Sequence, residues 1–150
     1  GRNLAYIVSR SPEALVVARS DVAGGDLNMV AQVPTCRDPS RIQVAEVPLD
    51  DGSVLLAFVS CFLSRSVQVI DADRLQGITI LTNISGAFEF VIDGPRRLMY
   101  IADFSTSVLR VADLRPLVAC LDGGAAGPEE CSPQLLGLVG LPQPVSELPR

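Results

Sequence analysis

The chain has 150 residues and a net charge of −5, and its 12 basic residues are all arginine, without lysine or histidine. This composition excludes a Schiff-base lysine, a histidine base and imidazole ligands for metal or haem within these residues, so we expect no cofactor. The acidic balance argues against a nucleic-acid partner, which requires a basic face. No run approaches the roughly 20 apolar residues that span a bilayer.

The first predicted unit begins near the first residue, with short apolar strands at 4–9 and 14–18. The same residue pattern recurs 52 positions later, at 56–61 and 66–70, without a gap. Self-similarity at a period of about 40 to 50 residues is typical of propellers and other repeat arrays. The second and third copies are ten positions closer together, so we place the extra material near 35–44, between two units.

The second and third units match at a constant offset of 42 from Asp51 to Asp113. Each opens with an Asp-Gly pair, at 51–52 and 93–94, which predicts tight hairpin turns with positive backbone dihedral angles. Apolar strands bounded by turn residues are expected at 56–60, 67–70, 78–81 and 87–92. We therefore predict an all-β fold of antiparallel four-stranded meanders in which Tyr6, Phe58 and Tyr100 are equivalent.

The runs 54–59 and 98–102 are apolar at nearly every position, which predicts strands covered on both faces. Stacked sheets give such cover, and a radial stack is a β-propeller. The units lie near 1–44, 45–86 and 87–142, and 143–150 would be the start of another blade or a tail. Three units do not close a ring. We expect an incomplete ring, completed by remaining blades on the same or a separate polypeptide.

Two stretches carry a family resemblance: Leu98-Met99-Tyr100-Ile101-Ala102-Asp103-Phe104 and Val67-Gln68-Val69-Ile70-Asp71. They resemble the "lYVaN" and "VsVID" strands of the YVTN family of β-propeller repeats, and the resemblance extends over roughly residues 3 to 142. It implies a propeller fold. It does not imply one activity, because the family's repeats occur in surface proteins, periplasmic binding modules and lactonases alike.

Four cysteines form an even set, which is typical of disulfide-bonded proteins outside the cytoplasm. Connections in a four-stranded meander alternate between the two faces of the ring. Cys36 and Cys61 then lie on one face, and Cys120 and Cys131, in the expanded connection before the last strand, lie on the other. Only the pairs 36 with 61 and 120 with 131 keep each bridge on one face, so we predict these disulfides. Four reduced, buried thiols are the alternative.

Ser9, Cys61 and Asp103 occupy the same place in the three units, at the end of the second strand. Propellers usually recruit ligands at one mouth of the ring, so these residues form a candidate binding-face row. Their different chemistry indicates no repeated role, and structural variation is the alternative. Asp103 and Asp113 could bind calcium, but we expect turn and cap roles for aspartates at strand ends and therefore no metal.

The sequence thus predicts a non-enzymatic β-propeller module of an exported bacterial envelope or extracellular protein. It would act as a scaffold or as a binding surface for a protein or ligand, located in the periplasm, on the outer membrane surface or outside the cell. The alternative is a propeller hydrolase of lactonase type, with Glu46 and Glu89 on the innermost strands as candidate acids. Under the offset of 42 these two lie one position out of register.

Overall fold

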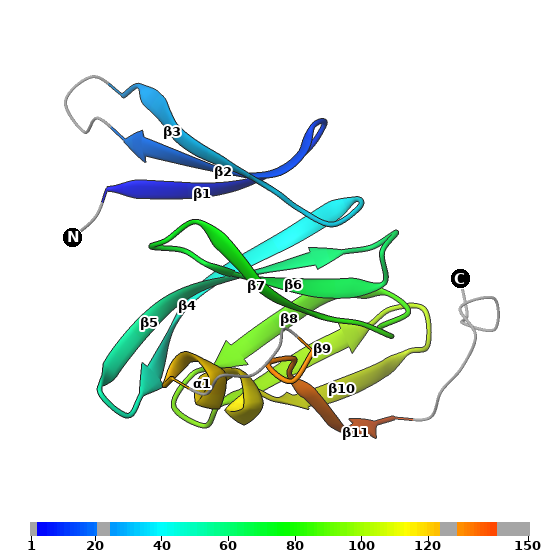
Figure 1. The fold of residues 1–150 in the computed structure, drawn as a ribbon. Helices are drawn as coiled ribbons and strands as arrows, with labels where there is room; N and C mark the ends of the chain where they lie inside the picture. Colours follow the sequence, from blue (N-terminus) through cyan, green and yellow to red (C-terminus); the bar gives the residue numbers. More distant parts are fainter. Residues whose placement is uncertain (1–2, 21–24, 124–128, 141–150) are drawn as a thin grey trace.

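The computed structural model describes residues 3–20, 25–123 and 129–140, which form three antiparallel sheets and one short helix (Figure 1). The first sheet contains β1 (Leu4–Arg10), β2 (Glu13–Ser20) and β3 (Leu27–Pro34). The second contains β4 (Pro39–Leu49), β5 (Gly52–Cys61), β6 (Ser66–Asp71) and β7 (Gln76–Leu81). The third contains β8 (Ala87–Asp93), β9 (Leu98–Asp103), β10 (Val108–Asp113) and β11 (Gln134–Val139), with α1 (Arg115–Leu121) between its last two strands.

The predicted all-β class is confirmed, and in each sheet consecutive strands are hydrogen-bonded neighbours. Two details differ from the expectation of three uniform meanders. The first sheet has three strands among the described residues, and the connection between β10 and β11 contains the helix α1. The segment 143–150, expected to be another strand or a tail, lies outside the described residues. No helix among those residues is long and apolar enough to cross a membrane.

The three sheets repeat one strand register. Tyr6 pairs with Val17, Phe58 with Val69 and Tyr100 with Val111, at the sequence offsets of 52 and 42. A β-bulge follows at the same place in each sheet, between the residues 17 and 18, 69 and 70, and 111 and 112. The equivalence of Tyr6, Phe58 and Tyr100 is therefore confirmed.

The first strands of the second and third sheets, β4 and β8, do not follow this offset. Ala45 of β4 pairs with Leu56, whereas Asp93 of β8 pairs with Leu98, so the offset between β4 and β8 is 48 instead of 42. The cause lies in the hairpins. The residues 52–55 belong to strand β5, but the equivalent residues 94–97 form the turn between β8 and β9.

The expectation of two equivalent Asp-Gly turns is therefore wrong. Gly52 opens β5 with a φ of 127°, whereas at the second turn the left-handed residue is Arg97, with a φ of 55°. The φ of Gly94 lies outside the left-handed region, and glycine is needed at this position for a different reason. A Cβ at Gly94 would lie 2.7 Å from the carbonyl oxygen of Glu46, so the close approach of β4 requires a residue without a side chain.

The second sheet is covered on both faces, and Figure 1 shows it between the other two. The face carrying Leu56 and Phe58 packs against the third sheet and α1. The opposite face, with Ala57 and Val59, packs against the first sheet. Side chains alternate between the two faces of a strand, so the continuous apolar run of β5 serves two cores.

Two disulfides join Cys36 to Cys61 and Cys120 to Cys131, with Cα atoms 5.8 and 5.6 Å apart. These are the pairs that strand parity predicts. The first connects the segment between the first two sheets to the end of β5. The second connects α1 to the segment before β11 and lies at the opposite ends of the strands.

Candidate functional site

The predicted binding-face row lies at one end of the strands, where its members make structural contacts. Cys61 is fully buried and bonded to Cys36 in the connection before β4. Asp103 is also buried and accepts a hydrogen bond from the backbone N–H of Ser85, in the connection before β8, at 3.2 Å. Ser9 is half-buried. In the second and third sheets, this position therefore ties the end of the second strand to the preceding connection.

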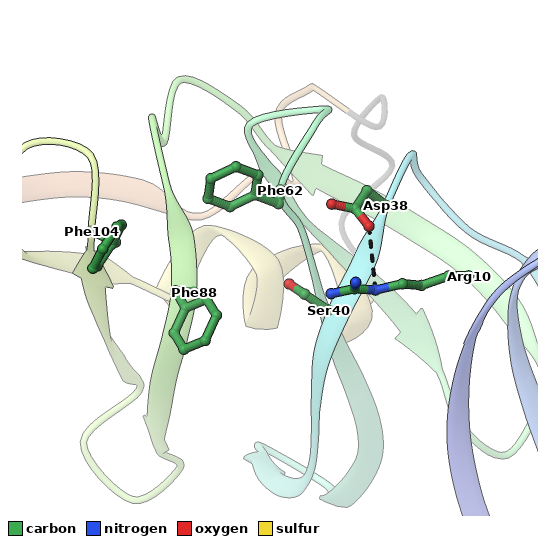
Figure 2. Close-up of a pocket in the computed structure, with 6 residues that line it drawn as sticks. All are labelled: Arg10, Asp38, Ser40, Phe62, Phe88 and Phe104. Carbon is green, nitrogen blue, oxygen red and sulfur yellow. Dashed lines mark ion pairs between the residues drawn. The ribbon is translucent and has the colours of Figure 1, made fainter. Parts of the chain in front are cut away.

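An apolar pocket of about 290 Å³ opens at the same end of the strands. It is lined by Arg10, Asp38, Ser40, Phe62, Phe88 and Phe104. In Figure 2 the Phe62 and Phe88 rings lie between Phe104 on one side and the Arg10–Asp38 ion pair on the other. All three sheets, or the segments that directly follow their strands, contribute to it.

The repeat generates this pocket. Arg10, Phe62 and Phe104 each follow the predicted row by one position and are equivalent at the offsets of 52 and 42. Ser40 and Phe88 are equivalent at the offset of 48, because each lies in the β-bulge of the first strand of its sheet. Successive side chains point to opposite sides of a strand, so the position after a buried residue can reach the pocket. The gap-free alignment of Phe62 with Phe104 was the available sequence signal.

Two of the three aromatic rings are open to solvent. Phe88 is 56% exposed and Phe104 is 55% exposed, and their centroids lie 6.2 Å apart with planes tilted by 45°. This is within the range of separations and tilts that aromatic pairs favour. Large apolar side chains that remain exposed and contact each other are typical of interaction sites.

The charged groups beside the pocket are matched in pairs. Arg10 lies 3.3 Å from Asp38, whose backbone N–H donates to the Glu13 carboxylate at 3.0 Å. Next to Ser40 and Phe88 in the chain, Arg41 contacts Glu89 at 2.5 Å. The Arg41 guanidinium holds the pKa of Glu89 below its usual value, mainly through this hydrogen bond. Each of the two arginines beside the pocket is therefore paired with a carboxylate.

The two candidate acids of the lactonase alternative do not meet. Arg41 of β4 lies beside Glu89 of β8, and Glu46 lies beside Gly94. Glu46 is therefore five positions farther along these strands than Glu89, a separation of about 16 Å at the usual rise per residue. Each carboxylate also has its own partner, because Glu46 accepts a hydrogen bond from Ser53.

Asp103 and Asp113, considered as calcium ligands, lie at opposite ends of one ladder. Asp103 pairs with Val108 and Asp113 pairs with Leu98, five steps away, which corresponds to about 16 Å. Asp113 accepts a hydrogen bond from the Arg115 backbone N–H at 2.9 Å, and Asp71 does the same for Arg74 at 2.8 Å. These are the cap roles expected for aspartates at strand ends. No cluster of three potential ligands occurs among the described residues.

Comparisons of the chain with protein-family models, with curated proteins and with solved structures found no match.

Proposed function

We propose that the chain is an arc of a β-propeller of the YVTN type. The support comes from repeat-equivalent positions that are buried in the second sheet and exposed at the ends of the stack. Leu81 of β7 is 5% exposed, but its equivalent Val139 of β11 is 62% exposed. Val59 of β5 is fully buried, but its equivalent Ile7 of β1 is 42% exposed. Further sheets of the same kind would cover both outer faces.

The two outer faces are complementary halves of one type of interface. At both junctions, the sheet face that carries Tyr6 or Phe58 meets the opposite kind of face on the next sheet, which carries Val59 or Ile101. The outer face of the third sheet carries Tyr100 and is of the first kind. The outer face of the first sheet carries Ile7 and is of the second kind. The remaining blades of the ring, on the same or a separate polypeptide, would extend the stack by the same packing.

Light scattering after size exclusion tests this arrangement. We expect the chain to self-associate through its outer faces, because they expose contiguous apolar surface. Leu109→Arg places a charge on the outer face of the third sheet and should shift the population toward monomer. Leu63→Arg is the matched control, since Leu63 is exposed but lies outside both faces. A chain that stays monomeric at every concentration would contradict the proposed stacking.

We infer that this arc serves as a non-enzymatic binding module of an exported protein of the bacterial envelope or of an extracellular assembly. The observation that carries the binding role is the aromatic pocket, bordered by two arginine–carboxylate pairs, at one end of the stack. Two disulfides support an oxidising compartment, since such bonds persist mainly outside the cytoplasm.

The compartment and the binding role have separate tests. Protein from its native cells is quenched with acid, then alkylated without reduction and analysed by intact mass. It should show no free thiol. Four alkylated thiols would contradict export. For binding, amide NMR spectra with small probes of several chemical classes should show shifts concentrated around Phe62, Phe88 and Phe104. Spectra that no class of probe perturbs there would contradict a binding role for the pocket.

A further inference from the structure

We infer that the pocket lined by Phe62, Phe88 and Phe104 binds one uncharged aromatic side chain of a protein partner. This inference rests on the proposed binding function and adds the chemistry of the partner. It is carried by the size of the pocket, the geometry of its rings and the charges of its rim.

The size of the pocket fits a single side chain. Ligand pockets usually occupy roughly 300 to 1,000 Å³. This pocket has a volume of about 290 Å³ and lies at the lower end of that range, which is enough for one bulky side chain. Phe88 and Phe104 are each more than half exposed, so an isolated molecule would remain partly in water. A side chain presented by a protein surface brings further surface that covers the rim, and exposed apolar patches bordered by polar groups mark protein interfaces.

The ring geometry favours an aromatic guest. Phe88 and Phe104 form a tilted pair at 6.2 Å, and both rings keep more than half of their surface open. A third ring can therefore add to the pair in an edge-to-face or offset arrangement without moving it. Bulky aromatic residues are also the side chains that most often anchor protein interfaces.

The rim charges disfavour ionic guests. A cation would compete with Arg10 for Asp38 and with Arg41 for Glu89, and an anion would compete with the same acids for the same arginines. The pocket-lining hydroxyl of Ser40 lies 3.1 Å from that of Ser60, so it is engaged within the protein. A sugar, which needs several hydrogen-bond partners, finds few here. A neutral apolar side chain can bind without disrupting any of these contacts within the protein.

The test uses the oxidised chain and capped pentapeptides followed by amide NMR. The probes are acetyl-Gly-Gly-Trp-Gly-Gly-amide, the same peptide with Ala in place of Trp, N-acetyl-tryptophanamide, tetramethylammonium and methyl glucoside. We expect the Trp peptide to shift amides at Phe62, Phe88 and Phe104. Its affinity should exceed that of the Ala peptide by roughly tenfold or more, as for an anchoring side chain, and should also exceed that of free N-acetyl-tryptophanamide.

Phe88→Ser should weaken binding of the Trp peptide by roughly tenfold, and Phe104→Ser provides a second variant on the other ring. Both rings are exposed, so a dispersed amide spectrum is the check that each variant folds. Leu63→Ser is the matched control and should leave the affinity unchanged. Binding of tetramethylammonium or methyl glucoside at the pocket, without the Trp peptide, would overturn the aromatic guest and retain the binding module. Preference for free N-acetyl-tryptophanamide over the peptide would overturn the protein partner, and silence of all probes would overturn both proposals.

Discussion

The junction between the first and second sheets differs from the junction between the second and third in how it is held. At the first junction, a disulfide links the connecting segment at Cys36 to the end of β5 at Cys61. At the second, the equivalent position is Asp103, which accepts a hydrogen bond from Ser85 and forms an ion pair with Arg110 at 2.6 Å. One position of the repeat thus carries a covalent bond in one copy and a buried charge in the next.

The apolar cores of the two junctions also differ in size. The second junction buries the larger set of side chains, since four-stranded sheets pack on both sides and α1 adds Leu117 and Val118. The first junction packs a three-stranded sheet and has the smaller core. The first junction thus combines a disulfide with the smaller apolar core. The second combines a buried carboxylate with the larger apolar core.

The largest expected effect is the loss of packing at the second junction. Phe58 is fully buried between the second and third sheets, so Phe58→Ala should lower the free energy of unfolding by about 4 kcal/mol through lost burial and a cavity. Leu15→Ala, in the core of the first junction, should cost about 3 kcal/mol. Urea denaturation measures both. A larger loss for Leu15→Ala would reverse the order of the two junctions.

The next effect is the removal of the disulfide at the first junction. The two cysteines have a sequence separation of 25. For a loop of that length, Cys36→Ala with Cys61→Ala should lower stability by about 3.5 kcal/mol in the chain-entropy model. Hydrogen exchange should accelerate most in β1 to β3, which depend on this tie.

The matched pair for this prediction is Cys120→Ala with Cys131→Ala, which opens the shorter loop. It should cost about 3 kcal/mol and loosen α1 and β11 instead of the first sheet. Uniform acceleration of hydrogen exchange in both variants would show that neither bond acts locally.

A smaller effect is expected when the buried charge at the second junction is neutralised. Asp103→Asn leaves the mostly buried guanidinium of Arg110 without its counter-charge. It should cost about 2 kcal/mol, below the cost of a fully buried pair because Arg110 still reaches solvent. A double-mutant cycle with Arg110→Gln isolates the coupling between the two side chains. If Asp103→Asn lowers the free energy of unfolding by less than about 0.5 kcal/mol, apolar packing alone stabilises this junction.

The smallest effect is a dependence on pH that belongs to the third sheet. Arginine partners lower the pKa values of Glu89, Asp93 and Asp113, all in β8 or β10, mainly through side-chain hydrogen bonds. A carboxyl whose pKa is lower in the folded state stabilises the protein at pH values above its pKa in the unfolded state, here 4.5 for Glu and 3.8 for Asp. This contribution is lost as the pH falls through the lower folded value.

Hydrogen exchange at pH 5.5 and pH 3 measures this dependence, after correction for the intrinsic rates. Protection of the third sheet should fall more than protection of the first. Glu89→Gln should reduce the fall around β8, because the substituted residue no longer titrates. An equal change in all three sheets, or an unaltered fall in the variant, would count against a local origin.

Much of the fold followed from the sequence, for local reasons. The offsets of 52 and 42 placed Tyr6, Phe58 and Tyr100 in equivalent strands, because each strand and its turn are specified by nearby apolar and turn residues. The continuous apolar run of β5 indicated burial on both faces. Strand parity gave the same disulfide pairs that the structure contains, since pairing depends only on the end of the strand at which each cysteine lies.

Other features depended on contacts between distant segments and were decided by tertiary structure. The approach of Gly94 to the Glu46 carbonyl accompanies a shift of the third sheet's first strand to an offset of 48, which no pattern within that hairpin reveals. The pocket combines Phe62 and Phe104 at strand ends with Phe88 at a bulge. A sequence specifies which residues are apolar and where strands turn. Only the stacking of the sheets determines which of these side chains line the same pocket, because that proximity arises between strands far apart in the chain.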